Sequence, residues 1–336
     1  MGIFNSLFGG KKNSDSEKKK NFDILKYDGI RAMRIGKLTY AIKCFKEAIE
    51  IQEDLETMNH LATVYTQTNQ MEEARTLIVR MTEIDAENPA HFLSLANLCF
   101  ILEDYQGMNE ACEKALAINS QIPVAYYLSA KASIGLKNGI QAIAMLTKAL
   151  MQKDDFAEAY QLRAEVLWSM RQAKDAMEDI EKLLTLNPED ENALLLKAEI
   201  AAANGDATLP MELIDQVIGM NPFNERAYLL KGNLLLALKE VDKAIAVYEE
   251  MSRQFPARGE LLMMLMDLYS QQKDYANLIK TLDRLEMKEG KSEQLSMEKY
   301  RIYLQMGDKE KAFTEIENLS KEYPNDLRYR VMLGDS

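Results

Sequence analysis

Small side chains recur along the chain at a nearly constant spacing, and this is the strongest pattern in the sequence. After a first step of 33 residues, every further step is 34 residues. The series is Gly29, Ala62, Ala96, Ala130, Ala164, Ala198, Gly232, Met266, Tyr300 and Gly334. Eight of these ten residues are Ala or Gly, which chance does not explain. An internal repeat of 34 residues therefore organises the chain.

Three further series accompany the small residues. Twelve residues after the small residue comes a position that is usually Ala, and four residues later comes a position that is usually large and apolar. This second series is Phe45, Ile78, Cys112, Leu146, Ile180, Ile214, Tyr248, Leu282 and Ile316. A third apolar position follows three residues later, and offsets of four and three place all three on one helical face. Each repeat is therefore predicted to hold two amphipathic helices, helix A with the small residue and helix B with these apolar positions.

Turn residues separate the predicted helices. Gly36, Asn69, Gly205 and Gly307 follow the helix A segments, where a left-handed residue commonly ends a helix. Prolines mark the ends of helix B segments at Pro188, Pro222, Pro256 and Pro324. Because one helix pair cannot bury its apolar face alone, neighbouring pairs are expected to stack and share a continuous core.

The pattern resembles the tetratricopeptide repeat family. The motif of that family has a small residue in helix A, an aromatic or large apolar residue three positions later, Ala opening helix B and Pro at the repeat boundary. The second repeat shows Ala62, Tyr65 and Ala74 at these positions. The resemblance implies an all-α fold, a right-handed α-solenoid of about nine 34-residue helix-turn-helix repeats plus a truncated tenth. It assigns residues 22–336 to the array and leaves residues 1–21 as a flexible basic tail.

Some positions depart from the motif. Pro210 replaces Ala near the start of one helix B, and Met266 and Tyr300 replace the small residue of two helices A. Local repacking is expected there. The pentatricopeptide family has a similar period and reads RNA, but the acidic body and the Ala and Pro positions of this chain favour the tetratricopeptide interpretation.

The resemblance also implies where a partner binds, because the helix A faces of this family line a concave groove. Carried over to this chain, the groove positions are Leu93, Asn97, Phe100, Tyr127, Lys131, Trp168, Leu229 and Asn233. The two asparagines are expected to bond a peptide backbone, and the aromatic residues are expected to anchor side chains. The alternative is that part of this set is core between repeats.

The charge distribution bounds the kinds of partner. The chain carries a net charge of −12, and residues 1–22 carry +3, so the remainder carries −15. This acidic balance argues against general nucleic-acid binding, which needs a basic surface. A protein or peptide partner is expected.

Chemistry for catalysis is not discernible in the sequence. The only histidines, His60 and His91, are isolated from one another and make no metal site. The three cysteines, Cys44, Cys99 and Cys112, lack the spacing of a disulfide framework or a CxxC motif. We expect no cofactor, no metal and no enzyme activity, and reduced thiols in a cytoplasmic compartment. Lys26 suits a carboxylate clamp known in some family members, but Ile30 stands where the clamp needs Asn.

The N-terminal tail has a separate character. Ile3, Phe4, Leu7 and Phe8 form an apolar helical stripe, and a cluster of lysines follows. An apolar wedge with a basic cluster favours membrane-surface contact. Gly2 with Ser6 also fits the N-myristoylation pattern. The alternative is a disordered tail.

Three functional hypotheses follow. The leading one is a cytoplasmic, non-catalytic scaffold or adaptor that binds a peptide segment in the groove. The second is a peripheral membrane-associated assembly factor docked by its tail. The third is the repeat arm of a larger protein that continues past Ser336, since the last segment looks like an unfinished helix A. A bare solenoid end also favours self-association.

Overall fold

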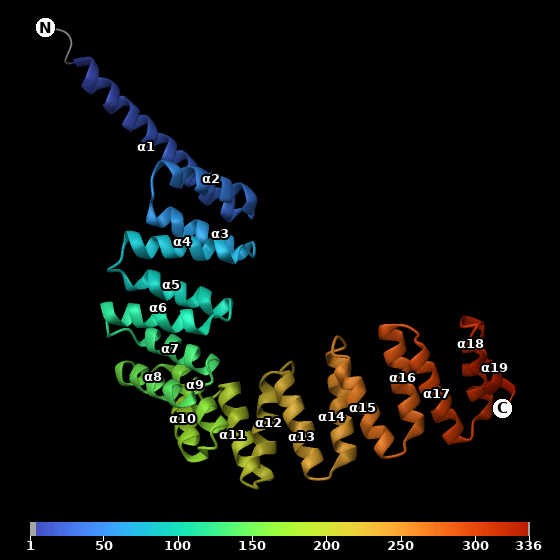
Figure 1. The fold of residues 1–336 in the computed structure, drawn as a ribbon. Coiled ribbons are helices and arrows are strands. Elements are labelled where there is room, and N and C mark those ends of the chain that lie inside the picture. The colour runs from blue at the N-terminus through green and yellow to red at the C-terminus, as the bar shows by residue number, and fades with distance from the viewer. Residues whose placement is uncertain (1–4, 335–336) are drawn as a thin grey trace. The chain divides into compact units, whose positions relative to one another are not determined.

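The computed structural model describes the backbone of residues 5–334 and the side chains of residues 14–334. Nineteen helices and no strand are found in this range, which confirms the all-α fold. The helices fall into two compact units, and the boundary between them along the chain follows Pro188. Figure 1 shows the succession of helices within each unit.

Unit 1 holds five helix pairs, and in each pair helix A precedes helix B. The bounds of its helices are α1 Asn5–Arg34, α2 Leu38–Ile51, α3 Leu55–Gln67, α4 Met71–Ile84, α5 Pro89–Ile101, α6 Tyr105–Ile118, α7 Pro123–Gly135, α8 Gly139–Gln152, α9 Ala157–Ser169 and α10 Ala173–Leu186. Each helix packs against the next one along the chain.

Unit 2 holds four helix pairs and one further helix A. The bounds are α11 Glu191–Ala203, α12 Thr208–Met220, α13 Glu225–Ala237, α14 Val241–Gln254, α15 Glu260–Gln271, α16 Tyr275–Glu289, α17 Glu293–Met306, α18 Lys309–Glu322 and α19 Leu327–Gly334. The described residues therefore contain nine helix pairs and one additional helix, as the period of the sequence predicts.

The small residues of helix A lie where helix B approaches. Gly29 lies under the Phe45 ring, and a Cβ atom at this position would come within 2.5 Å of that ring. Gly232 lies under Tyr248 in the same way, at 2.4 Å. Where the residue is Ala, as at Ala96 and Ala130, the side chain is fully buried. The recurring small residue is thus a requirement of close packing between the two helices of a repeat.

The predicted apolar series of helix B forms the core. Each member of the series from Phe45 to Ile316 is buried, and most are completely inaccessible to solvent. In unit 1 these residues join core clusters that run through successive helix pairs, and in unit 2 one cluster extends from Tyr228 to Ile302. Burial shared between repeats is what stabilises helices of only 12 to 15 residues, such as α15 and α16.

The turns between helices A and B share one left-handed residue. The positions with positive φ are Gly36, Asn69, Glu103, Lys137, Arg171, Gly205, Lys239, Lys273 and Gly307. The four Gly and Asn residues confirm the predicted helix ends. The other five carry long side chains that rarely adopt this conformation, so sequence pattern alone did not mark them.

The residue after the left-handed position caps both helices: its backbone amide bonds to the end of helix A, and its side chain, where it is Asp or Asn, bonds to the start of helix B. The Asp104 amide donates to the Cys99 carbonyl at 2.8 Å, while its carboxylate accepts from the Gly107 amide at 2.9 Å. Asn138, Asp274 and Asp308 cap their helices in the same way. The first bond closes helix A in a Schellman motif and the second caps helix B, which fixes the tight reversal.

The departures from the motif are accommodated locally. Pro210 is buried in the first turn of α12, where helix amides have no intrahelical partner, so its missing N–H costs no bond. Met266 and Tyr300 are partly buried against neighbouring apolar clusters.

Side-chain burial locates where packing begins along α1. Among residues 14–334, Phe22 is the first buried side chain. That the array begins at residue 22 stays a prediction. The backbone of residues 5–21 is nevertheless continuous with α1, so the expected boundary does not fall at a helix end. That residues 1–21 are flexible stays a prediction. Within the described range, every helix is too short or too polar to cross a bilayer.

Candidate protein-binding surface

Some helices A of neighbouring repeats touch each other directly. In unit 1, α1 contacts α3 and α5 contacts α7, and in unit 2, α11 contacts α13. Side chains that project from the two helices of each of these pairs are therefore close enough to form one surface. We call the exposed sides of α1, α3, α5, α7 and α9 the helix-A face of unit 1.

Three of the predicted groove residues, two aromatic residues and one lysine, come together in the structure. The Nζ atom of Lys131 on α7 lies 3.8 Å from the centre of the Phe100 ring on α5. The same nitrogen lies 5.8 Å from the centre of the Tyr127 ring, one turn earlier on α7. Leu93 and Tyr127 both pack against the core cluster beneath them. We call Phe100, Tyr127 and Lys131 the aromatic–lysine cluster.

A further aromatic residue, Phe156, extends this cluster. The Phe156 ring lies 5.2 Å from the Tyr127 ring, centre to centre, and the Lys153 ammonium lies 5.1 Å from the Phe156 ring. Phe156 is the residue before α9, in the loop between two repeats. The sequence did not single out Phe156, because the groove positions implied by the resemblance all lie on helix A. Its aromatic side chain is the one feature of the sequence that marks it as a candidate.

Burial and nearby charges determine the protonation and the solvent exposure of the cluster. Burial raises the pKa of the Tyr127 phenol, and the nearby carboxylates of Glu158 and Glu165 raise it further. The phenol is therefore neutral at physiological pH and remains a hydrogen-bond donor. Phe100 is 38% exposed, and Asn97 one turn earlier on α5 is also exposed. The cluster thus has a buried base and an accessible rim.

The remaining predicted groove residues lie elsewhere. Trp168 on α9 is partly buried, and its ring lies 5.4 Å from the Arg171 guanidinium of the following turn. Leu229 and Asn233 belong to unit 2. Leu229 packs against the core cluster of that unit, and the Asn233 Oδ1 atom accepts a hydrogen bond of 2.7 Å from the Tyr248 hydroxyl. The Asn233 side chain is therefore already engaged within its own repeat.

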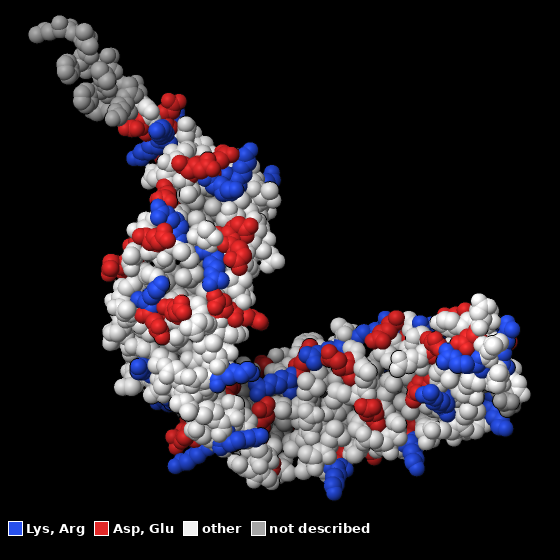
Figure 2. Space-filling model, viewed as in Figure 1, with Lys and Arg blue, Asp and Glu red and all other residues white. Residues whose placement is uncertain are grey.

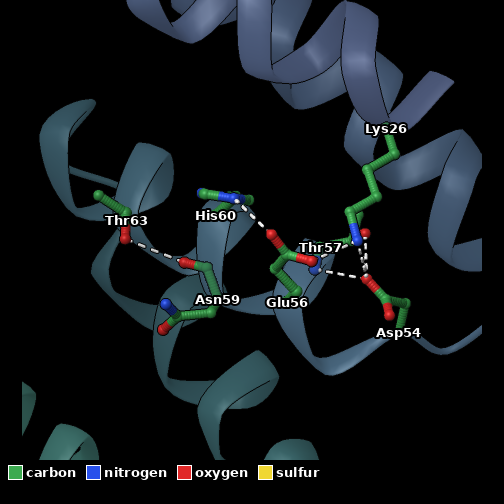
Figure 3. Close-up of polar contacts among 7 residues, drawn as sticks. All are labelled: Lys26, Asp54, Glu56, Thr57, Asn59, His60 and Thr63. Carbon is green, nitrogen blue, oxygen red and sulfur yellow. Dashed lines mark hydrogen bonds and ion pairs between the residues drawn. The ribbon is translucent and has the colours of Figure 1, made fainter. Parts of the chain in front are cut away.

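Lys26 is held inside the first two repeats. Its ammonium donates to Asp54 at 3.0 Å and to Glu56 at 2.6 Å, while Asp54 caps α3 through Thr57, as Figure 3 shows. Burial lowers the pKa of Lys26, but the bonds to Glu56 and Asp54 outweigh it, so the pKa is raised overall. A lysine fixed in this way holds α1 on α3 and is unsuited to grip a ligand.

A groove lies beside this ion-paired group. It has a volume of about 790 Å³ and is lined by Tyr27, Ile30 and Arg34 of α1 and by Glu56 and His60 of α3, among others. His60 stacks on the Phe45 ring at 5.7 Å and lies 3.8 Å from Glu56. The stacking of His60 on Phe45 is not evident from the sequence, because Phe45 lies on another helix, α2.

Reactive groups on the described residues are few. No group of three or more His, Cys, Asp or Glu residues in that part of the chain is arranged to hold a metal ion. All three cysteines are buried and reduced, and burial raises the pKa of Cys112 to about 12. Such a thiol stays protonated and is a poor nucleophile. On the face drawn in Figure 2, acidic and basic side chains are interspersed among wide uncharged areas.

Comparisons with known proteins agree with this architecture. The family model described as anaphase-promoting complex, cyclosome, subunit 3 matches residues 169–251. A tetratricopeptide repeat protein from Parabacteroides merdae is 17% identical with a TM-score of 0.50, and the match covers 73% of this chain and 97% of that chain. A chain of the APC/C hetero-tetramer Cut9–Hcn1 is 12% identical with a TM-score of 0.52, covering 79% of this chain and 52% of that one. The chain has the fold of tetratricopeptide repeat proteins.

Other similar structures are more distant in shape. YrrB, described as a tetratricopeptide repeat protein with an unusual peptide-binding site, is 19% identical with a TM-score of 0.46, and the match covers 56% of this chain and 97% of that chain. No curated protein matches. The two structures with TM-scores of 0.50 and 0.52, at 17% and 12% identity, show the fold and leave the ligand open.

The side chains of the apolar stripe predicted in the tail lie outside the part of the chain that the structure describes. Ile3 and Phe4 are not among the described residues, and the side chains of Leu7 and Phe8 are likewise outside them. Membrane contact through these four residues stays a prediction.

Proposed function

We propose that this tetratricopeptide repeat protein is a non-catalytic cytoplasmic scaffold that binds a segment of a partner protein on the helix-A face of unit 1. The observation that carries the proposal is the aromatic–lysine cluster. It brings two aromatic rings and an ammonium group from neighbouring repeats together, with the Phe100 ring exposed.

The composition of the cluster suits protein recognition. Aromatic side chains contribute a large share of the energy at protein interfaces, particularly where they are half-buried and rigid. Packing beneath holds Tyr127, and Lys131 lies against Phe100, so little side-chain entropy remains to be lost on binding. Exposed Asn97 on the same helix as Phe100 supplies an amide donor and acceptor for a backbone.

Site-specific photocrosslinking tests the proposal. A photoreactive phenylalanine analogue is placed at Phe100, and in a matched protein at Ile140, an exposed apolar residue of the helix B α8 in the same unit. In the native host, a distinct crosslinked partner is expected from position 100 and not from position 140. Equal crosslinking at both positions would place binding away from the cluster.

Quantitative binding then identifies the contribution of the cluster. For the crosslinked partner, Phe100→Ala is expected to weaken binding by about tenfold to a hundredfold, because truncating an interface anchor costs about 1–3 kcal/mol. Ile140→Ala is the control and is expected to bind as the wild type does. Unchanged binding by Phe100→Ala would refute the assignment of the site.

A further inference from the structure

The first helix pair presents an exposed surface that carries both apolar and basic side chains. Phe22, Lys26, Gly29 and Ala32 form the buried stripe of α1. The opposite stripe follows at the helical period and contains Lys20, Ile24, Tyr27 and Arg31, and Ile35 follows directly after the helix. Ile24, Tyr27 and Ile35 are 49%, 58% and 68% exposed, which is high for side chains of this kind.

Two positions on and beside this stripe are core in the second repeat. Leu61 and Val64, located 33 residues after Asp28 and Arg31, are 3% and 0% exposed. In α1 these two positions hold an ion pair between Asp28 and Arg31. If another protein helix packed on this ion pair, it would remove water from both charges at a cost in free energy. Contact with a hydrated, charged surface would leave the pair solvated. The α1 stripe therefore suits contact with a hydrated, polar surface into which the apolar side chains beside the ion pair can insert.

The turn between α1 and α2 continues this surface. Ile35, Lys37 and Tyr40 line one shallow groove together with the Asp28–Arg31 pair. Tyr40 is 51% exposed. Aromatic side chains with a polar end are favoured at the interface between lipid headgroups and acyl chains. We call Ile24, Tyr27, Arg34, Ile35, Lys37 and Tyr40 the repeat-1 outer surface.

The charge of the chain is polarised toward this end. The first helix pair, residues 5–51, contains eleven Lys and Arg against six Asp and Glu, a net charge of +5. The rest of the chain therefore carries −17. An anionic bilayer attracts the first helix pair and repels the remainder, which selects one orientation on the membrane.

We propose that the repeat-1 outer surface binds the surface of a bilayer that contains acidic phospholipids. Ile24 and Ile35 enter the headgroup region, Tyr27 and Tyr40 lie at the interface, and Arg34 and Lys37 contact lipid phosphates. The proposal is independent of peptide binding by the aromatic–lysine cluster. It also places the contact on the folded repeat, beyond the tail residues that the sequence singles out.

Vesicle flotation of the full chain tests this. The probes are vesicles of phosphatidylcholine alone and of phosphatidylcholine with about one third phosphatidylserine. The wild type is expected to float with the second kind only, and less so at high salt. Arg34→Gln/Lys37→Gln is expected to bind about 25-fold more weakly, from about fivefold for each charge removed near the surface. Ile24→Ser/Ile35→Ser is expected to reduce binding while keeping its salt dependence.

Matched variants keep the test specific. Lys114→Gln/Lys182→Gln and Ile140→Ser/Met151→Ser change exposed helix B residues of the same unit and are expected to bind as the wild type does. Phe100→Ala is also expected to bind vesicles normally, which separates this surface from the peptide site. Circular dichroism establishes that each variant is folded. All variants retain residues 1–21, so normal flotation of the repeat-1 variants would assign any binding to the tail and overturn the proposal.

Two other outcomes would also overturn it. One is failure of the wild type to float with acidic vesicles. The other is concentration-dependent self-association of the wild type without lipid that the repeat-1 substitutions abolish. That result would identify the acidic body of a second copy as the occupant of this surface.

Discussion

The ammonium of Lys131 lies 3.8 Å from the centre of the Phe100 ring, which belongs to the preceding repeat. The contact joins α7 to α5 on the side where these two helices A touch. It therefore stabilises the interface between two repeats while it leaves part of the ring accessible.

This relationship predicts an energetic coupling between the two side chains. In a double-mutant cycle with Lys131→Gln and Phe100→Leu, the coupling is expected to be about 0.5–1 kcal/mol, as for partly exposed cation–π pairs. The free energy of unfolding in urea provides the measurement. A coupling of zero within error would mean that the ammonium and the ring do not interact in solution.

The close approach of Tyr248 to Gly232 predicts a strong effect of one methyl group. Gly232→Ala places a Cβ atom against the Tyr248 ring and is expected to lower the free energy of unfolding by about 1–3 kcal/mol, the usual cost of overpacking. Gly219→Ala is the control, because nothing lies within 4 Å of the added atom on α12. That control is expected to stabilise the helix by up to about 1 kcal/mol. Equal effects of both substitutions would contradict the packing seen here.

Replacing a non-glycine residue at a left-handed turn position by glycine is expected to stabilise the folded protein. Lys239 adopts a φ of 61°, and Lys239→Gly is expected to raise the free energy of unfolding by about 1 kcal/mol. The reverse change, Gly205→Ala, is expected to destabilise, although no atom lies within 4 Å of its added Cβ. Thermal unfolding of both variants distinguishes a backbone effect from a packing effect. A lower melting temperature for Lys239→Gly would disprove the strain.

The Asp54 carboxylate predicts a loss of stability in acid. Burial raises the pKa of Asp54, but hydrogen bonds from Thr57 and Lys26 outweigh it, so the pKa is lowered overall. A lowered pKa in the folded state contributes stability above the unfolded value of about 3.9, and this is lost as the pH falls through the folded value. Asp54→Asn keeps a capping side chain and is expected to reduce the fall in unfolding free energy between about pH 5 and pH 2.

The comparison for this experiment is Glu72→Gln, which changes an exposed carboxylate of α4. It is expected to retain the acid sensitivity of the wild type. If Asp54→Asn and the wild type lose stability in parallel, the stabilisation of Asp54 by Lys26 and Thr57 is not present in solution.

Local periodicity accounts for the part of the structure that the sequence determined. The recurrence of small and large apolar residues every 34 positions predicted the helix pairs, their number and the buried series from Phe45 to Ile316. These features depend on which side of a helix a residue occupies, and the helical period alone settles that. Turn ends at Gly36 and Asn69 followed from conformational preference in the same local way.

Only the tertiary structure decided which side chains meet. Phe156 joins Tyr127 from a loop, Asn233 bonds Tyr248 of its own repeat, and Lys26 is taken up by Asp54 and Glu56. Five left-handed turns carry charged residues because the fixed spacing of two packed helices imposes the conformation on whatever residue stands there. Contacts between repeats depend on distances across helices, which a one-dimensional period does not contain.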